Sequence, residues 1–129
     1  MGWLPSSLGD RFAPFTEPIK NIELVAVMEN IFQNRINRFN LLLAVYNATD
    51  ASYEQAVNVY TLATNVGLSG AQCRRVFAYL LEEGLLRANE NGGEFFANFT
   101  HKGTKAVEEV FIDQYQATYY FPAYREMRS

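Results

Sequence analysis

Apolar residues recur at helical spacing over the first third of the chain. Between residues 19 and 36 they fall mostly three or four positions apart, which predicts a helix, and the same pattern resumes over residues 39–46, where a further helical segment is expected. The helix over 19–36 carries apolar residues on several faces, so we expect it to be buried, here in a subunit interface. Thr16, followed by an acid and a proline, is typical of an N-cap and first turn. The Asn-rich segment 33–38 is either a break in the helix or a polar stripe along it.

Shorter segments follow in the middle of the chain. Residues 51–59 have helix spacing but include Val57-Asn58-Val59, which is also typical of a strand; we expect a short helix or turn there. Residues 61–66 are predicted to form a second helix. It ends at Gly67, since glycine tolerates the left-handed backbone common at helix ends. Leu68 is expected to pack back on these helices as the apolar residue of the turn.

A third helix and a hairpin come next. Ser69 is the predicted N-cap of the helix, which ends at Gly84. Residues 85–88 and 94–99 are strand-like, and the Asn and Gly residues of segment 89–93 predict a tight turn between them. The core positions of the helix recur at helical spacing: Cys73, Phe77 and Leu80.

The last part of the chain predicts one more helix and an aromatic tail. Thr100 or Thr104 opens this helix, which continues through Tyr115 or as far as Tyr119 before Pro122 stops it. The elements together are mainly helical with a small hairpin. The expected fold class is therefore mainly α (α+β).

The composition is that of one folded domain without a large net charge. The chain has 129 residues, of which 49% are hydrophobic, so a packed core is expected and disorder throughout is excluded. Its 11 basic and 14 acidic residues give a net charge of -3. That charge argues against indiscriminate coating of polyanions, but not against a DNA binder with its basic residues on one face. A single cysteine and the absence of a long apolar run predict a cytoplasmic protein without membrane association.

Catalytic chemistry has few candidate residues in this sequence. His101 is the only histidine and Cys73 the only cysteine. Neither a metal-ligand spacing nor a glycine-rich phosphate loop occurs. We therefore expect no enzyme activity, no catalytic residue, no cofactor and no metal. We interpret Cys73 as a packing residue rather than a redox sensor, because a buried thiol is inert.

Five short motifs occur in order between the second predicted helix and the last one. They are Leu62-Ala63, Gly67-Leu68-Ser69, the core positions Cys73, Phe77 and Leu80, Glu82-Glu83-Gly84-Leu85-Leu86, and Phe99-Thr100-His101-Lys102-Gly103. Over residues 36–112 the chain resembles the winged helix-turn-helix domain of MarR, ArsR and PadR type transcription regulators of bacteria and archaea. The resemblance implies a helix-turn-helix followed by a small β-wing and flanked by N- and C-terminal helices.

The resemblance also implies a homodimer that binds DNA and regulates transcription. The third helix would enter the major groove, and each wing would lie along the flanking backbone or minor groove. Gln72 would bind adenine and Arg75 guanine, the pairings that base edges favour. Thr61 and Ser69 would donate to phosphates. The residues that the resemblance implies to face DNA are Ser69, Gly70, Ala71, Gln72, Arg74, Arg75, Tyr79, Lys102 and Lys105.

The wing departs from the family pattern at its tip. A wing that contacts DNA usually carries Arg or Lys there, whereas this tip holds Glu90 and Glu94. From residue 72 to residue 105, five basic side chains stand against four acidic ones, which is a modest positive footprint. The leading hypothesis is a sequence-specific DNA-binding transcriptional regulator. The alternative is a winged-helix module for protein–protein interaction that does not bind DNA.

Three segments are expected along the chain: an irregular arm over 1–15, a winged helix domain over 16–112, and a C-terminal aromatic helix end and tail over 113–129. Aromatic side chains are enriched in interfaces, so we expect both flanking regions to contribute to the dimer. The residues concerned are Ile22, Val25, Met28, Phe32, Phe111, Tyr115 and Tyr119. The C-terminal aromatics could instead line a pocket for a small-molecule effector, but no convergent polar group marks one.

Overall fold

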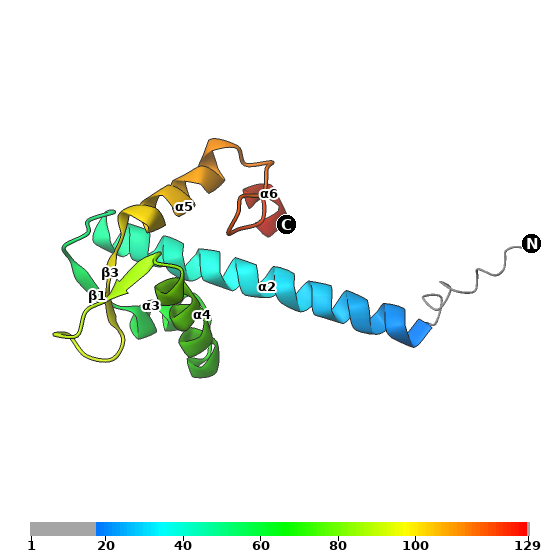
Figure 1. The fold of residues 1–129 in the computed structure, drawn as a ribbon, viewed down its shortest axis with the longest axis horizontal. Helices are drawn as coiled ribbons and strands as arrows, with labels where there is room; N and C mark the ends of the chain where they lie inside the picture. The colour runs from blue at the N-terminus through cyan, green and yellow to red at the C-terminus, as the bar shows by residue number, and fades with distance from the viewer. Residues whose placement is uncertain (1–17, 129) are drawn as a thin grey trace, which may run out of the picture. The chain divides into compact units, whose positions relative to one another are not determined.

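The computed structural model describes residues 18–128, with side chains from residue 22 onward. The predicted arm over 1–15 and the predicted N-cap at Thr16 lie outside this range. The described chain is mainly helical and contains a three-stranded antiparallel sheet, so the expected α+β class is confirmed (Figure 1). None of the helices in this range has the length and apolar character needed to cross a membrane.

Helix α2, Pro18–Thr49, is uninterrupted. The Asn-rich segment 33–38 is helical throughout, so the alternative of a break there is wrong. Internal contacts divide the chain into residues 1–33, the first unit, and residues 34–129, the second unit. Within the second unit, α2 buries apolar side chains in the core: Phe39, Leu41, Leu42 and Val45.

A strand precedes the next helix, where a short helix or turn was expected over 51–59. β1, Ala56–Asn58, pairs antiparallel with β3, Phe96–Phe99. Helix spacing is misleading here because the strand is stabilised by a partner far along the chain, which local spacing does not report. Asn58 then caps α3, Val59–Asn65, by accepting a backbone hydrogen bond from the first turn of this helix.

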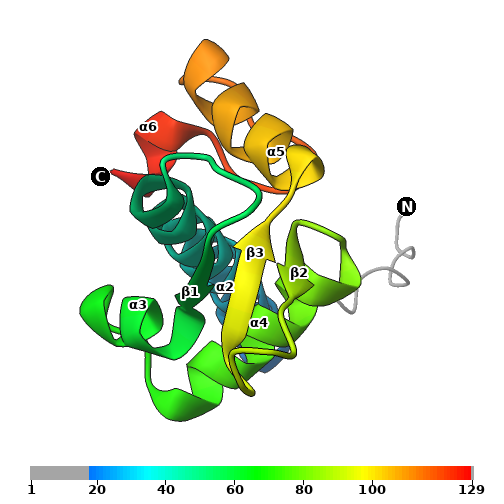
Figure 2. The same ribbon diagram turned by 90° about the vertical axis from the view of Figure 1, so that its left-hand side faces the viewer.

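The sheet has the strand order β1-β3-β2 (Figure 2). β2, Leu86–Ala88, and β3 form the predicted antiparallel hairpin around residues 89–93. α4, Gly70–Glu82, follows α3 after a short turn. All these elements contribute to one core, which includes Val59, Ala63, Cys73, Phe77, Leu80, Leu86, Ala97 and Phe99.

Helix α5, His101–Ile112, is shorter than predicted. Thr100 is its N-cap, one of the two predicted candidates. The prediction that the helix continues to Tyr115 or Tyr119 is wrong. The chain leaves the helix at Asp113, whose carboxylate accepts a hydrogen bond from the Tyr115 backbone N–H at 3.1 Å. An aspartate bonded to the backbone two residues later favours a turn over a further helical turn.

The C-terminal tail folds back on α2. Phe121 is fully buried and packs edge-on against Phe39, with ring centroids 5.2 Å apart. Residues 113–123 are irregular, and only the short helix α6, Tyr124–Met127, follows them. The predicted helix end is thus replaced by an irregular segment, because that path buries an aromatic side chain that a straight helix would carry away from the core.

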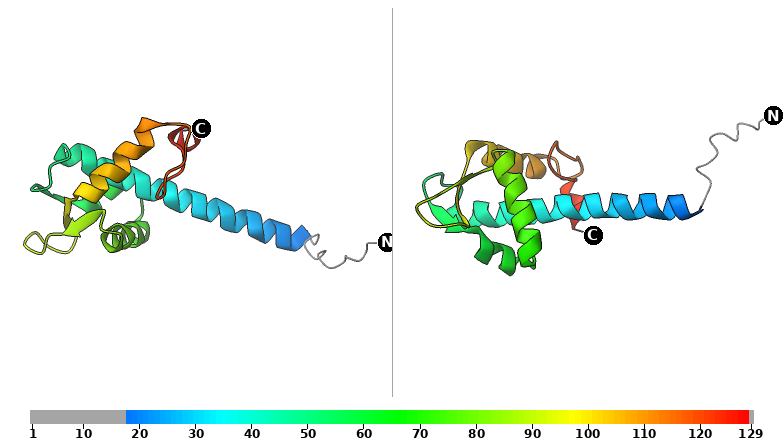
Figure 3. Two further views of the ribbon diagram at one scale, coloured as in Figure 1. Left: turned by 45° about the horizontal axis from the view of Figure 1, so that its top comes forward. Right: turned by 60° about the horizontal axis from the view of Figure 1, so that its bottom comes forward.

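A close contact joins the end of α4 to the beginning of α5. The Thr100 hydroxyl accepts a hydrogen bond from the Gly103 N–H at 2.9 Å and lies 2.8 and 2.9 Å from the carbonyl oxygens of Gly84 and Leu85. A Cβ at Gly103 would collide with the Leu85 carbonyl oxygen. Figure 3 shows α5 starting where β3 ends, so this junction anchors the hairpin at the base of α5.

Candidate functional site

The turn between α3 and α4 is built as the sequence indicates. Gly67 has a positive φ of 87°, which glycine tolerates best, and Leu68 packs against the core. The Ser69 hydroxyl accepts a hydrogen bond from the Gln72 N–H at 3.1 Å, and the Gln72 side-chain oxygen accepts one from the Ser69 N–H at 2.8 Å. This reciprocal capping box fixes the first turn of α4.

Helix α4 has one buried and one exposed face. Burial raises the pKa of the Cys73 thiol, which is consistent with a packing role and not with a reactive thiolate. The exposed face begins with Ala71 and carries the side chains of Arg74 and Arg75. The buried face consists of Cys73, Val76, Phe77 and Leu80, which include all three predicted core positions.

A tyrosine of α3 lies over the start of α4. A Cβ at Gly70 would be 3.2 Å from the Tyr60 hydroxyl oxygen and 3.8 Å from a guanidinium nitrogen of Arg74. The small residue at position 70 therefore makes room for Tyr60. The Tyr60 ring packs edge-on against Phe95 at 5.1 Å, and Phe95 lies 6.0 Å from the Phe77 ring, both measured between centroids. These aromatic contacts tie the β2–β3 hairpin to both helices.

A polar hollow lies between α4 and the second-unit part of α2; we call it the α2–α4 hollow. The Arg38 guanidinium carbon is 3.8 Å from the centroid of the Tyr79 ring, on which it stacks. Burial raises the pKa of Tyr79 above the usual value of a tyrosine. The hollow is lined by Asn34, Asn37, Arg38, Gln72, Arg75 and Val76, none of which is acidic.

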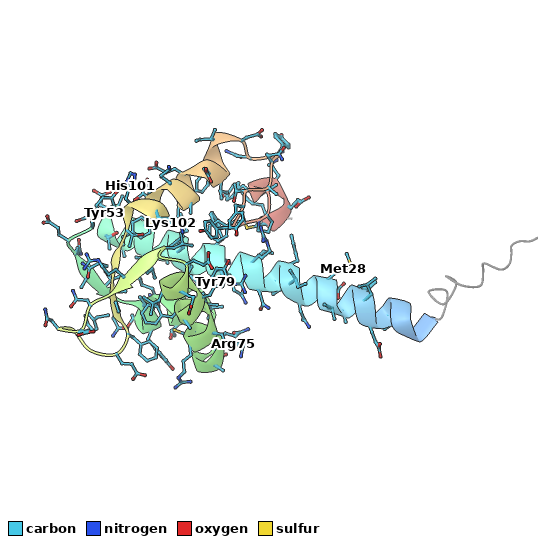
Figure 4. The ribbon with its side chains drawn as sticks, in the orientation of Figure 1. Met28, Tyr53, Arg75, Tyr79, His101 and Lys102 are labelled. Atoms are coloured by element: carbon cyan, nitrogen blue, oxygen red, sulfur yellow. The ribbon has the colours of Figure 1, made fainter. Side chains whose placement is uncertain are left out.

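The two predicted lysines belong to the start of α5 and not to α4. Lys102 and Lys105 are both exposed. The hydrogen bond between Lys102 and Tyr120 is the main reason that the pKa of this lysine is raised. In the same turn of α5, the His101 Nδ1 lies 3.2 Å from the Tyr53 hydroxyl (Figure 4). The structure therefore divides the predicted site residues between two helices.

The turn between β2 and β3 is acidic and exposed. Glu90 and Glu94 both lie on the surface. The Asn89 side-chain oxygen accepts a backbone hydrogen bond two residues further on, at 3.0 Å. A Cβ at Gly92 would lie only 2.6 Å from carbons of the Phe96 ring, so this glycine allows the ring to pack against the turn. The turn is thus held by specific contacts and carries two carboxylates.

The residues predicted to form a dimer are all exposed in the single chain. Exposed apolar side chains in a cluster are typical of protein–protein contacts. Ile22 exposes 67% of its surface and Tyr119 exposes 81%. The set comprises Ile22, Val25, Met28 and Phe32 in the first unit, and Phe111, Tyr115 and Tyr119 in the second.

A separate apolar hollow bears on the effector alternative. The Tyr46 hydroxyl donates a hydrogen bond to the Glu108 carboxylate at 2.8 Å, which is the main reason that the pKa of Tyr46 is raised. The hydroxyl and the carboxylate of this hollow are therefore already hydrogen-bonded to each other. The lining consists of Tyr46, Val107, Glu108, Phe111 and Ile112, so Phe111 alone of the predicted aromatics belongs to it.

Sequence reasoning missed the contribution of α2 to the polar face. Asn34, Asn37 and Arg38 are three and four residues apart, so they share one face of a helix. The polar stripe that the sequence offers over residues 33–38 contains all three, but it does not identify them as residues of a site. That α4 lies opposite them depends on tertiary packing, which spacing does not report.

Among residues 18–128, no group of three or more His, Cys, Asp or Glu side chains could hold a metal ion. No protein-family model matches the chain, and comparisons with curated proteins and with solved structures find no match. A functional interpretation therefore rests on the geometry and charge of α4 and its neighbours.

Proposed function

We propose that this chain is a winged helix-turn-helix protein that binds DNA and regulates transcription without catalysing a reaction. In this proposal α3 and α4 are the helix-turn-helix pair, α4 enters the major groove, and the β2–β3 hairpin is the wing. The observation that carries the proposal is the exposed face of α4, where Ala71, Arg74 and Arg75 directly follow the capped turn at Ser69.

Arg75 has the leading role in base recognition in this proposal. Its planar guanidinium can donate two parallel hydrogen bonds to guanine. Gln72 is less free, because its side-chain oxygen already accepts the Ser69 N–H. To pair with adenine, that oxygen would have to accept a second hydrogen bond. The Ser69 hydroxyl accepts a bond within the cap but keeps its proton for a phosphate oxygen.

A homodimer is part of the proposal, because proteins of this type bind DNA as dimers whose two recognition helices contact two half-sites of one operator. The exposed apolar side chains of α2 in the first unit, which include Ile22, Val25 and Met28, support self-association. Sedimentation velocity at the protein concentrations of the DNA assay measures it. A monomer at all these concentrations would contradict the dimer.

A pull-down tests the function by measuring how much genomic DNA the protein retains as the salt concentration is raised. Each base contact is worth about 1–3 kcal/mol, so Arg74→Ala/Arg75→Ala should lower the affinity for a selected fragment at least about tenfold. The control is Arg125→Ala/Arg128→Ala, which removes the same charge from α6 and its C-cap. Equal, weak retention of the wild type and of the α4 variant at moderate salt would disprove DNA binding.

The second candidate function is a protein–protein interaction module. The exposed Glu90 and Glu94 of the β2–β3 turn and the net charge of -3 favour it, since both oppose contact with a polyanion. Under this alternative the α4 face would bind a protein surface. The same retention assay separates the two functions, because only a DNA-binding protein loses retention when the α4 arginines are removed.

A further inference from the structure

We infer that the α2–α4 hollow is a phosphate site, and that it takes one phosphodiester of the DNA backbone beside α4. The identity of the phosphate source rests on the proposed function, whereas the presence of a phosphate site does not. The family resemblance implies no DNA contact from α2, so the phosphate site gives α2 a role of its own.

The chemistry of the lining matches a phosphate. Phosphate oxygens only accept hydrogen bonds, and the Arg38 guanidinium supplies a planar set of N–H donors, while Arg75 adds a second positive charge to the lining. The Gln72 side chain adds a further donor. Because its oxygen is held by the Ser69 N–H at 2.8 Å, its NH2 group is the end left for a ligand. None of the lining residues carries a carboxylate that would repel an anion.

The Arg38 side chain is held in position before any ligand arrives. Its guanidinium stacks on Tyr79 at 3.8 Å, and stacking covers the flat face of the group while its N–H bonds remain directed outward in the plane. A pre-positioned side chain loses less conformational entropy on binding. Arg35, one turn earlier, differs: its guanidinium is 3.4 and 3.5 Å from the carbonyl oxygens of Thr118 and Tyr119 and anchors the tail.

The position of the hollow agrees with a backbone contact next to base recognition. Arg75 lies both on the exposed face of α4 and in the lining. Phosphates flank any helix that enters the major groove, and contacts to them set its register. The acidic β2–β3 turn is unsuited to that task. Arg38, in the lining of the hollow, supplies the positive charge for a phosphate that the turn lacks.

Binding of duplex DNA by the full chain, measured by fluorescence anisotropy over a range of salt concentrations, tests the inference. Arg38→Gln should weaken binding about tenfold, the effect of losing a charged hydrogen bond. It should also lower the slope of log K against log salt by about 0.9, the value for one phosphate contact. Arg38→Lys keeps the charge and should keep the slope, although it loses the stacked planar group.

Arg125→Gln is the matched control. Arg125 also stacks on a tyrosine, with its guanidinium carbon 5.0 Å from the Tyr115 ring centroid, but it lies on α6 and is not part of the lining. Its substitution should leave both affinity and slope unchanged. Circular dichroism of all variants checks that they are folded. If Arg38→Gln matches the wild type in affinity and slope while Arg74→Ala/Arg75→Ala loses binding, the proposed function stands and the phosphate site is disproved.

A titration with inorganic phosphate alone separates the two sources of phosphate. We expect saturable shifts of the Gln72 side-chain amide signals in NMR spectra of the wild type, and none in Arg38→Gln. If the wild type fails to bind DNA but shows these shifts, the proposed function fails and the hollow serves a free phosphate group. If neither DNA binding nor the shifts occur, both the function and the phosphate site are overturned.

Discussion

Two surfaces of the second unit contrast in charge, although the aromatic contacts of Tyr60, Phe95 and Phe77 connect the elements that carry them. The α2–α4 surface carries Arg38 and Arg75, whereas the β2–β3 turn carries Glu90 and Glu94. Both are held by specific contacts: stacking and capping on one side, and the packing of Gly92 against Phe96 on the other.

The two surfaces belong to one connected set of helices and strands, but they carry charges of opposite sign. The hairpin keeps its packing against α3 and α4, so its structural role does not depend on the charge of its tip. With the inferred phosphate site, the positive contact with the DNA backbone comes from α2 in this chain. The charge of a turn and its position in the fold are therefore separate properties, and each can be changed by mutation.

The largest effect is expected from Gly103→Ala, which disturbs the junction on which the hairpin and α5 depend. The new Cβ would collide with the Leu85 carbonyl oxygen. Overpacking costs about 1–3 kcal/mol, and the rigid backbone partner places this site at the upper end, partly offset by the better helix propensity of alanine. We expect a loss of about 2 kcal/mol in the free energy of unfolding, measured by urea denaturation.

Glu109→Ala is the control for this change, because Glu109 is an exposed residue of the same helix. It should alter the free energy of unfolding by less than about 0.5 kcal/mol. A Gly103→Ala variant as stable as the wild type would show that the contact between Gly103 and Leu85 relaxes freely and does not anchor the hairpin.

A smaller effect is expected from reversing the charges of the turn with Glu90→Lys/Glu94→Lys. If the turn lies along the DNA backbone, two new phosphate contacts raise the salt slope by up to about 1.8. The affinity at low salt should rise about tenfold. Fluorescence anisotropy with a selected duplex measures both quantities. The matched control, Glu54→Lys/Glu109→Lys, changes the net charge equally; an equal gain in this control would mean that the position of the turn is irrelevant.

The smallest effect on binding is expected from Gly92→Ala, which moves the turn without changing its charge. A Cβ at this position would overlap the Phe96 ring, so the turn must shift and the stability should fall by about 1 kcal/mol. The DNA affinity should nevertheless stay within about twofold, since an acidic tip makes no attractive phosphate contact. A loss of binding as large as that of Arg38→Gln would contradict the assignment of the backbone contact to α2.

The sequence by itself determined the helix boundaries that depend on neighbouring residues. Gly67 and Ser69 mark the turn between α3 and α4 because positive φ and capping are local properties. Cys73, Phe77 and Leu80 are buried as their spacing predicts. The turn and the cap are made by residues within a few positions of one another, and the apolar face of α4 is set by spacing along one helix, so the local pattern is enough to predict them.

Only the tertiary structure decided the features that join distant parts of the chain. β1 is a strand because β3 pairs with it, and the tail after α5 folds back because Phe121 is buried against Phe39. The α2–α4 hollow likewise needs two helices. Arg38 can be recognised in the sequence as part of a polar stripe, but its stacking on Tyr79 and its place opposite Gln72 and Arg75 follow from helix packing alone.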